Sequence, residues 1–340
     1  MNNLLVRRSL WSVLTLALLA QSGSAVAFGV LQAYESALQN DPVYRSAVSE
    51  NEAGQQYRVL GRAGLLPSVS ANYSTYKNKA DITSKNQLGQ SQSTHPDYNS
   101  AVGVVQARQP LFNLDALARY YQGIAQTNYS NAVFSSRSQE LVLRVMSAYA
   151  DTQYAEDQLM LVTAQREAFA EQMRVNDRTF QKGEGTRTDV LETQARFELA
   201  EAQVFEAKDN LTNARNTLAG VIGRDVPVLD ALGDDFRVAP MQPAGFEEWS
   251  RITLERNPEI EAQRFGVEAA LQEVKRNRAG HTPRVDLVAS YNKNNSETIN
   301  TYNQDSNVRS LGVQVVIPIY SGGSVNASTS QAVANSEKAK

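Results

Sequence analysis

Few side chains in this sequence have the types and spacing that bond chemistry requires. Cysteine is absent, so no thiolate can act as a nucleophile or metal ligand and no disulfide can form. The two histidines, His95 and His281, are too few for a multi-histidine metal site. The adjacent acids at 234–235 and 247–248 are more simply solvated loop charges than a general acid–base pair. We therefore expect no enzyme, no cofactor and no metal site.

The most distinctive spacing lies at 183–191, where the sequence reads Gly-Glu-Gly-Thr-Arg-Thr-Asp-Val-Leu. Gly183 and Gly185 supply the backbone freedom of a helix end, and Thr186 with Asp189 fits a capping box for a following helix. As a phosphate-binding loop the match is poor, because no Gly-Lys-Ser/Thr follows and no strand precedes it. The pattern predicts a tight turn between two helices.

Composition limits the class of protein that these elements can form. The chain has 340 residues, of which 42% are apolar and 20% charged, so it is not a compositionally disordered chain. Lys and Arg number 33 against 36 Asp and Glu, for a net charge of -3. This balance lacks the basic footprint of a protein that grips nucleic-acid phosphates. We expect no nucleic-acid partner.

Residues 1–27 have the pattern of an export signal. Arg7 and Arg8 precede an apolar core at 10–20, and Ala25-Val26-Ala27 forms a cleavage motif with Ala25 and Ala27 as its small residues. A transmembrane anchor is the alternative, but the apolar run is shorter than the roughly 20 residues that span a bilayer. We expect the signal to be removed and the protein to be exported.

The rest of the chain contains an internal duplication. Four motifs recur at an offset of 216 positions, and a fifth recurs at an offset of 208. A unit of about 200 residues is too long for a solenoid repeat and indicates duplication of a half-molecule. The pairs are Asp41-Pro42 with Asn257-Pro258, Glu52-Ala53 with Glu268-Ala269, Arg62-Ala63-Gly64 with Arg278-Ala279-Gly280, Leu66-Pro67 with Thr282-Pro283, and 109–112 with 317–320.

Each repeat is expected to run helix, β-hairpin, long helix, turn and helix. In the first repeat Pro42 marks a break, and Gly61, Gly64 and Pro67 are expected to end the first helix. The first repeat, 28–220, is divided into a helix at 30–61, a hairpin at 67–111, a long helix at 113–182, a turn at 183–189 and a helix at 190–220. A linker at 221–246 leads to an incomplete second repeat at 247–340, with a helix at 247–279, a hairpin at 283–320 and the start of a long helix at 324–340.

The hairpin segments alternate apolar and polar residues in strands of about ten residues, a pattern that fits either a soluble hairpin or a transmembrane β-barrel. A sheet in lipid cannot leave an edge unpaired, so four strands would need other copies of the chain to close a barrel. Two copies would give a barrel filled by side chains, and three would leave an open lumen. The residues expected to face lipid are Val69, Ala71, Tyr73, Val105, Val285, Leu287, Tyr291, Leu311, Val313, Val315 and Ile317.

The long helices have the heptad spacing of a coiled coil. At 190–220 large apolar residues recur every seven positions, and small or β-branched residues follow three positions later. The remaining surface is polar. Heptads alone fit a stiff coiled-coil rod or the helical wall of a water-filled duct, and the nearby strands favour the duct.

Taken together, these features resemble the TolC-type family of outer-membrane efflux and secretion proteins. The resemblance covers 28–340 and is most specific at 180–196, FQKGEGTRTDVLETQAR. Within the family this turn is most similar to the type I secretion branch, which includes the alkaline protease exporters. The implied fold is a mixed α and β membrane protein. Three chains would form a homotrimer with a 12-stranded outer-membrane β-barrel, continued by long antiparallel helical hairpins as an α-barrel in the periplasm.

The resemblance also implies partners and a function. These are copies of the chain itself, outer-membrane lipid, a periplasmic adaptor, and an inner-membrane ABC exporter or proton-driven pump. The expected function is a passive aqueous exit duct for protein; the alternatives are drug or metal efflux, or a periplasmic coiled-coil protein that forms no channel. The adaptor would dock at the turn, on Gly183, Gly185, Thr186, Arg187, Thr188, Asp189, Val190 and Leu191.

The second repeat is shorter than the first. A full second repeat would extend about 90 residues beyond Lys340, so the sequence is interpreted as a fragment of a longer protein. The carboxylate ring that gates members of the family lies on the second turn. No residue of this chain is expected to inherit that role.

Overall fold

The computed structural model describes residues 28–85, 89–233, 236–296 and 304–340. The described chain packs as two compact units: residues up to Val48 with Arg137–Gly245, and Ser49–Ser136 with Phe246–Lys340. This packing groups the chain differently from the predicted repeats, whose boundaries stay a prediction. The predicted export signal, with Ala25 and Ala27, lies outside the described residues.

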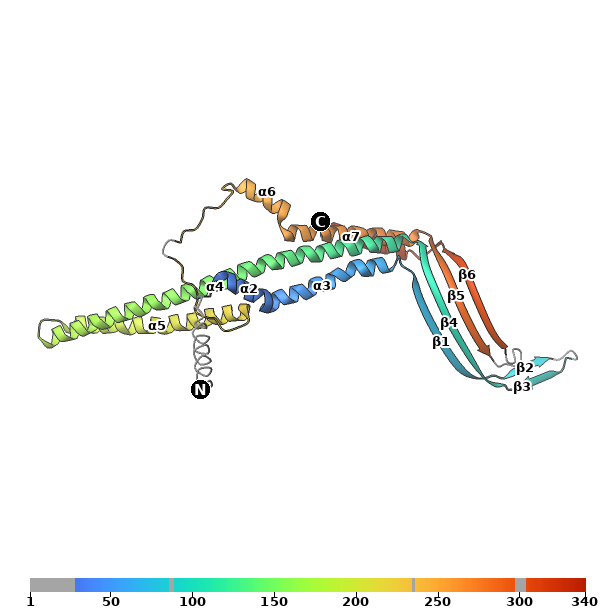
Figure 1. The fold of residues 1–340 in the computed structure, drawn as a ribbon, viewed down its shortest axis with the longest axis horizontal. Coiled ribbons are helices and arrows are strands. Elements are labelled where there is room, and N and C mark those ends of the chain that lie inside the picture. The colour runs from blue at the N-terminus through green and yellow to red at the C-terminus, as the bar shows by residue number, and fades with distance from the viewer. Residues whose placement is uncertain (1–27, 86–88, 234–235, 297–303) are drawn as a thin grey trace, which may run out of the picture. The chain divides into compact units, whose positions relative to one another are not determined.

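Helices and strands alternate in groups along the chain (Figure 1). They are α2 (Val30–Asn40), α3 (Pro42–Ala63), β1 (Ser68–Lys79), β2 (Ile82–Lys85), β3 (Ser91–Thr94), β4 (Asp97–Phe112), α4 (Leu114–Gln181), α5 (Arg187–Ile222), α6 (Phe246–Arg256), α7 (Pro258–Arg278), the 3-10 turn η1 (Ala279–His281), β5 (Arg284–Ser296), β6 (Gln304–Val316) and α8 (Ser324–Ala339).

The segment at 30–61 has the break predicted at Pro42, and the segment at 247–279, expected as a single helix, is interrupted in the same way. The segment at 30–61 breaks at Asp41, with φ -60° and ψ 118°, and the segment at 247–279 breaks at Asn257, with φ -72° and ψ 121°. Pro42 and Pro258 follow, and a proline disfavours helical backbone in the residue before it. The Asn257 side chain accepts hydrogen bonds from the N–H groups of the next helix at 2.8 and 3.3 Å. Each break therefore starts a new, capped helix.

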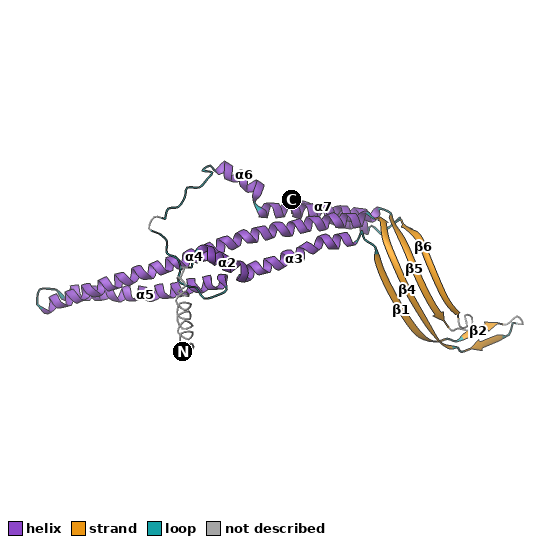
Figure 2. Ribbon diagram, in the orientation of Figure 1, coloured by secondary structure: helices purple, strands orange, loops and turns teal. Residues whose placement is uncertain are grey.

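The second unit contains a four-stranded antiparallel sheet in the order β1-β4-β5-β6 (Figure 2). Strand β4 pairs with β5, so the two hairpins join into one sheet with β1 and β6 at its edges. Between β1 and β4 lies the separate two-stranded hairpin β2–β3. In this hairpin Thr83 lies opposite Ser93, and their hydroxyl oxygens are 3.1 Å apart.

In the second unit, α3 and α4 approach closely at glycines. A Cβ on Gly123 would lie 2.3 Å from the carbonyl oxygen of Tyr57, and one on Gly61 would lie 2.7 Å from that of Arg119. The prediction that Gly61 helps to end the first helix is wrong, because α3 continues to Ala63. Gly61 instead allows two backbones to meet where no side chain fits.

The core of the first unit combines α2, α4, α5 and the chain near Leu229. Leu141, Val145, Leu218 and Ile222 are almost completely buried there. The heptad positions expected in the returning helix supply its contact face, since the buried residues of α5 are Thr193, Ala200, Val204, Ala207, Leu218, Val221 and Ile222. Large and small side chains therefore alternate along this face, as antiparallel helices in close contact require.

Tyr149 of α4 connects the start of the described chain to the segment after α5. Its hydroxyl oxygen lies 2.9 Å from the carbonyl oxygen of Phe28 and 3.1 Å from that of Asp230, and it accepts a hydrogen bond from the Asp230 N–H at 3.1 Å. Phe28 also pairs with Leu229 in an isolated parallel β-bridge. Burial, the main cause, raises the pKa of Tyr149 above its ordinary value of 10.0.

Among the described helices, none combines the length and the apolar character that crossing a membrane as a helix would need.

Candidate functional site

The register of the four-stranded sheet sorts its residues onto two faces. Val69 lies opposite Ala107, which lies opposite Ala289, which lies opposite Leu311. Because side chains alternate along a strand, residues two positions away share the face of each of these. We call this the apolar face; its apolar members and its glycine are Val69, Ala71, Tyr73, Ala101, Gly103, Val105, Ala107, Val285, Leu287, Ala289, Tyr291, Leu311, Val313 and Val315. Polar and charged residues also lie on it, mainly toward the strand ends far from the helices: Thr75, Lys77, Lys79, Asp97, Asn99, Gln109, Lys293, Asn295, Asp305, Asn307 and Arg309.

The residues predicted to face lipid lie on this apolar face, apart from Ile317, which follows the end of β6 at Val316. Several are strongly exposed in the single chain: Tyr73 by 75%, Leu311 by 76% and Ile317 by 63%. Val285 is half-buried. The register thus brings residues more than 200 positions apart in sequence onto one exposed surface, and their contact with lipid remains a prediction.

The opposite face, which we call the polar face, carries mostly Ser, Asn and Gln. Alternation is incomplete, because Val102, Val104, Val288, Val308 and Val316, together with Tyr76 and Tyr98, also lie there. The polar members include Ser68, Ser70, Asn72, Ser74, Ser100, Gln106, Arg108, Asp286, Ser290, Asn292, Asn294, Ser306, Ser310 and Gln314. A sheet with one apolar and one mainly polar face matches the wall of a barrel that separates lipid from water.

An ion pair on the polar face joins the two hairpins. Arg108 of β4 contacts the carboxylate of Asp286 of β5, whose side chain is only 1% exposed. Asp286 Oδ1 has no hydrogen-bond partner in the described part of the chain. A buried carboxylate of this kind depends strongly on its cation. The sequence alone does not reveal this contact, because only the pairing of β4 with β5 brings Arg108 and Asp286 together.

The turn between α4 and α5 has the expected capping geometry. Thr186 donates to Asp189 Oδ2 at 2.7 Å and accepts from the Asp189 N–H at 3.2 Å, and the Thr186 N–H points to the same carboxylate at 3.3 Å. Gly183 has a φ of 80°, a left-handed backbone that favours glycine. Glu184 N–H donates to the carbonyl oxygen of Thr179 at 3.1 Å and closes the end of α4.

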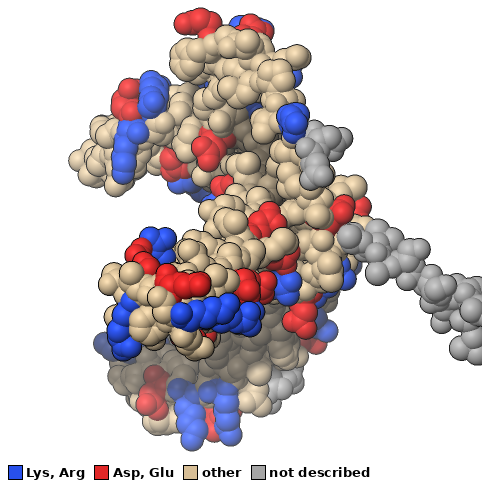
Figure 3. All heavy atoms as spheres, turned by 90° about the vertical axis from the view of Figure 1, so that its left-hand side faces the viewer, with Lys and Arg blue, Asp and Glu red and all other residues tan. Residues whose placement is uncertain are grey.

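The side chains of the turn divide into two groups. Those of Thr186 and Asp189 are used by the cap, whereas the exposed side chains of Arg187, Thr188 and Leu191 make no hydrogen bond or ion pair within the described residues. Viewed from this end of the α4–α5 hairpin, basic and acidic side chains lie side by side (Figure 3). The turn therefore presents a small exposed surface of mixed charge, and docking of an adaptor there remains a prediction.

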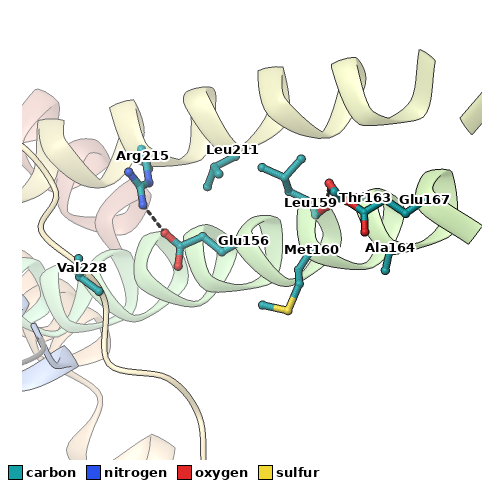
Figure 4. Close-up of a pocket in the computed structure, with 9 residues that line it drawn as sticks. All are labelled: Glu156, Leu159, Met160, Thr163, Ala164, Glu167, Leu211, Arg215 and Val228. Carbon is teal, nitrogen blue, oxygen red and sulfur yellow. Dashed lines mark hydrogen bonds and ion pairs between the residues drawn. The ribbon is translucent and has the colours of Figure 1, made fainter. Parts of the chain in front are cut away.

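A groove of about 550 Å³ runs along the α4–α5 hairpin (Figure 4). At one end Arg215 Nη2 lies 2.6 Å from Glu156 Oε1, and Met160 is 68% exposed. Its mostly apolar lining leaves room for side chains of another helix. The lining residues are Glu156, Leu159, Met160, Thr163, Ala164, Glu167, Leu211, Arg215 and Val228.

The side chains considered for catalysis do not converge. His95 lies 3.5 Å from Asp81, while His281 contacts Asn326 at 3.0 Å. Glu248 is exposed and pairs with Arg251 along α6 at 2.5 Å. The acids at 234–235 lie outside the described residues. Within the described ranges no three His, Asp or Glu side chains are grouped as a metal site would require.

A protein-family model described as "Outer membrane efflux protein" matches residues 33–224 and 249–340. The chain belongs to the outer membrane efflux protein family. The resemblance to TolC-type proteins and the outer-membrane assignment are thereby confirmed. The family match spans the helical hairpin and both hairpins of the sheet, and so includes the turn as well as the apolar face.

Two curated relatives in this family are named for protease secretion. The alkaline protease secretion protein AprF of Pseudomonas aeruginosa is 42% identical over 316 residues, covering 92% of this chain and 66% of the relative. The proteases secretion protein PrtF of Dickeya chrysanthemi is 37% identical, covering 96% and 71%. The outer membrane protein TolC of Escherichia coli is 25% identical, covering 92% and 64%. The predicted similarity to the secretion branch is confirmed.

The chain spans about two thirds of the length of these curated relatives. Among solved structures, the chain resembles the channel protein CusC with a TM-score of 0.76 and 19% identity, covering 92% of this chain and 71% of CusC. It also resembles the outer-membrane channel OprN, with a TM-score of 0.74, 19% identity and coverage of 91% and 68%. These likenesses confirm the predicted fold class, a mixed helical and strand fold of the channel type.

Proposed function

We propose that this chain belongs to the outer-membrane component of a protein-secretion system, which provides a passive aqueous duct across the outer membrane and periplasm. The observation that carries the proposal is the division of the four-stranded sheet into an apolar and a mainly polar face. Identities of 42% and 37% to two proteins named for protease secretion support protein as the cargo.

The open edges of the sheet support assembly of several copies. Strands β1 and β6 have no partner on their outer sides among the described strands. A sheet in lipid must close, because unpaired backbone groups are costly in hydrocarbon. Three copies supply twelve strands, enough to leave a lumen, whereas eight strands are filled by side chains. In the trimer, β6 of each copy pairs with β1 of the next, the apolar face meets lipid and the polar face meets water.

The helices extend the duct into the periplasm. Helix α4 has 68 residues, which corresponds to about 100 Å at 1.5 Å per residue. Apolar side chains that stay exposed on the single chain, such as Met160, Leu161 and Phe205, would be covered by neighbouring helices of the assembly. The groove of Figure 4 is one such place. The turn meets a periplasmic adaptor, which connects the duct to an inner-membrane ABC exporter or proton-driven pump.

Disulfide trapping tests the trimer, because these 340 residues contain no cysteine. Ser70→Cys on β1 is combined in turn with Ser306→Cys, Ser310→Cys or Gln314→Cys on β6, all on the polar face. We expect one combination to give covalent dimers and trimers after oxidation of outer membranes. Ser70→Cys with Gln106→Cys is the matched control, because these residues face each other within one chain and should give only an intrachain bond.

The same preparations are assayed for ion conductance in planar bilayers and for export of a protein cargo by cells. Trapped trimers that conduct ions and cells that export the cargo support the duct. Intermolecular bonds absent from all three combinations, in a protein that purifies as a monomer without detergent, would contradict it. Conductance and export of small molecules with no export of protein would favour the drug or metal efflux alternative.

A further inference from the structure

Basic side chains follow the apolar face at one end of the sheet. Lys77 lies four positions beyond Tyr73 on β1, Lys293 lies two positions beyond Tyr291 on β5, and Arg309 of β6 lies opposite Tyr291. All three therefore share the apolar face. Lys293 and Arg309 are diagonal neighbours, with a backbone separation of about 7–8 Å that lets both side chains reach one anion.

This end of the sheet is the one farthest along the strands from the helices. Strand β1 starts after α3 and β4 ends before α4, so Val69 and Phe112 lie at the helical end. Lys77 and Lys293 lie near the opposite ends of their strands. If the helices extend into the periplasm, as proposed above, the basic residues reach the outer surface of the membrane.

A shallow depression lies beside these charges. It has a volume of about 280 Å³ and is lined by Tyr73, Gly103, Val105, Tyr291 and Lys293, together with Ala71 and the strands beneath. A Cβ on Gly103 would be 3.7 Å from the ring of Tyr73. The ring of Tyr73 therefore borders the space left open by the absent side chain of Gly103. The Arg309 guanidinium lies 5.8 Å from the centre of the Tyr291 ring. The depression is thus apolar, with two cationic groups at its edge.

The three cations lack acidic partners in the described chain. The nearby Lys79, by contrast, has an acidic partner: its Nζ lies 4.0 Å from Asp97 Oδ2. Two carboxylates lie on the same face: Asp97 is the diagonal neighbour of Lys77, and Asp305 is the diagonal neighbour of Lys293. Asp305 accepts a hydrogen bond from Asn295 at 2.7 Å. Cations placed side by side at the edge of an apolar surface repel each other and are costly in lipid. An anion at the level of the headgroups would remove both costs.

We infer that this surface binds a phosphorylated glycolipid of the outer leaflet, with the phosphate between Lys293 and Arg309 and an acyl chain over Gly103. The inference rests on the proposed function, which turns the apolar face toward lipid. The positive charges favour a phosphate as the bound group. The adjoining apolar depression favours a phosphate that is attached to an apolar chain. Lys and Arg contribute to the affinity by attraction and by hydrogen bonding to the phosphate oxygens.

The test compares the natural protein with the variant K293Q/R309Q. A matched control, R45Q/K208Q, removes the same charge from exposed positions away from the sheet. The detergent-solubilised protein is titrated with bis-phosphorylated lipid A, and bound lipid is counted by native mass spectrometry. We expect the first variant to bind at least about tenfold more weakly, because each Lys or Arg near anionic headgroups adds affinity, while the control binds as the natural protein does.

Two further probes identify the ligand chemistry. Dephosphorylated lipid A should bind the natural protein as weakly as bis-phosphorylated lipid A binds the first variant, and inorganic phosphate should not compete. Equal binding of both lipids, full competition by inorganic phosphate, or equal affinities of the two variants would overturn the inference. Conductance of each variant is measured in parallel. A conducting trimer without the expected loss refutes only the lipid site, whereas a natural protein that forms no trimer refutes the proposed function and this inference together.

Discussion

Asp41 and Arg144 form an ion pair inside the first unit, with 2.9 Å between Asp41 Oδ1 and Arg144 Nη2. The side chain of Asp41 is 2% exposed, and the same oxygen accepts a hydrogen bond from the Tyr44 N–H at 2.6 Å. One carboxylate therefore both caps α3 and neutralises a cation of α4. Asn257 occupies the corresponding position in the second repeat and also caps its helix, α7. Its amide side chain is uncharged, so it has only the capping role.

Substitution of Asp41 tests this double role. Asp41→Ala leaves Arg144 without its anion and removes the cap, and we expect the free energy of unfolding to fall by about 3–5 kcal/mol. Asp41→Asn can still cap the helix and should cost less. Far-ultraviolet circular dichroism during chemical denaturation measures the change. The control is Asp209→Ala on the exposed surface of α5, and an effect of Asp41→Ala no larger than that of the control would show that the pair is unimportant.

The close backbone contact at Gly123 predicts that alanine, normally the most favourable residue in a helix, is destabilising at this position of α4. Alanine normally stabilises a helix relative to glycine, but a Cβ at 123 would lie 2.3 Å from the carbonyl oxygen of Tyr57. We expect Gly123→Ala to cost about 1–3 kcal/mol because the backbones must separate. Gly220→Ala in α5 is the control, since nothing lies within 4 Å of its Cβ position, and it should stabilise by about 0.4–1 kcal/mol. Stabilisation by both substitutions would disprove the close contact.

At the turn, docking and capping can be separated. Thr188→Arg and Leu191→Glu change exposed side chains that make no hydrogen bond in the described structure, so we expect a large fall in protein export with normal trimer formation. Thr186→Ala removes the cap at a cost of about 1 kcal/mol while leaving most of the surface intact, and should affect export less. Export is measured as cargo in the medium, and trimers by cross-linking. Unchanged export in both surface variants would exclude docking at this turn.

The raised pKa of Tyr149 predicts a loss of stability in alkali. The unfolded chain deprotonates this phenol near its ordinary pKa of 10.0, before the folded chain does, because burial disfavours the phenolate. The contribution of the protonated Tyr149 phenol to the free energy of unfolding is intact below pH 10. It falls as the pH rises from 10 toward the pKa of Tyr149 in the folded chain. Tyr149→Phe should lower stability at neutral pH, by about 1–3 kcal/mol for the lost hydrogen bonds, and should reduce the alkaline decline. The free energy of unfolding is measured against pH, and identical slopes for the two proteins would contradict the assignment.

Sequence periodicity predicted the main elements because each strand and helix carries its own signal. The turn was predicted down to the Thr186–Asp189 cap for the same reason, since a capping box is a local pattern. The contact of Arg108 with Asp286 and the close approach at Gly61 were missed. Both depend on which distant segments lie side by side, and a glycine that permits close packing has the same local signal as one that ends a helix.

The pairing of β4 with β5 also imposes an order on biogenesis. Arg108 and Asp286 are 178 residues apart, and at about 5–20 residues per second their synthesis is separated by about 10–35 s. During that interval the first hairpin exists with the edge of β4 uncovered, exposed to aberrant pairing with other nascent chains.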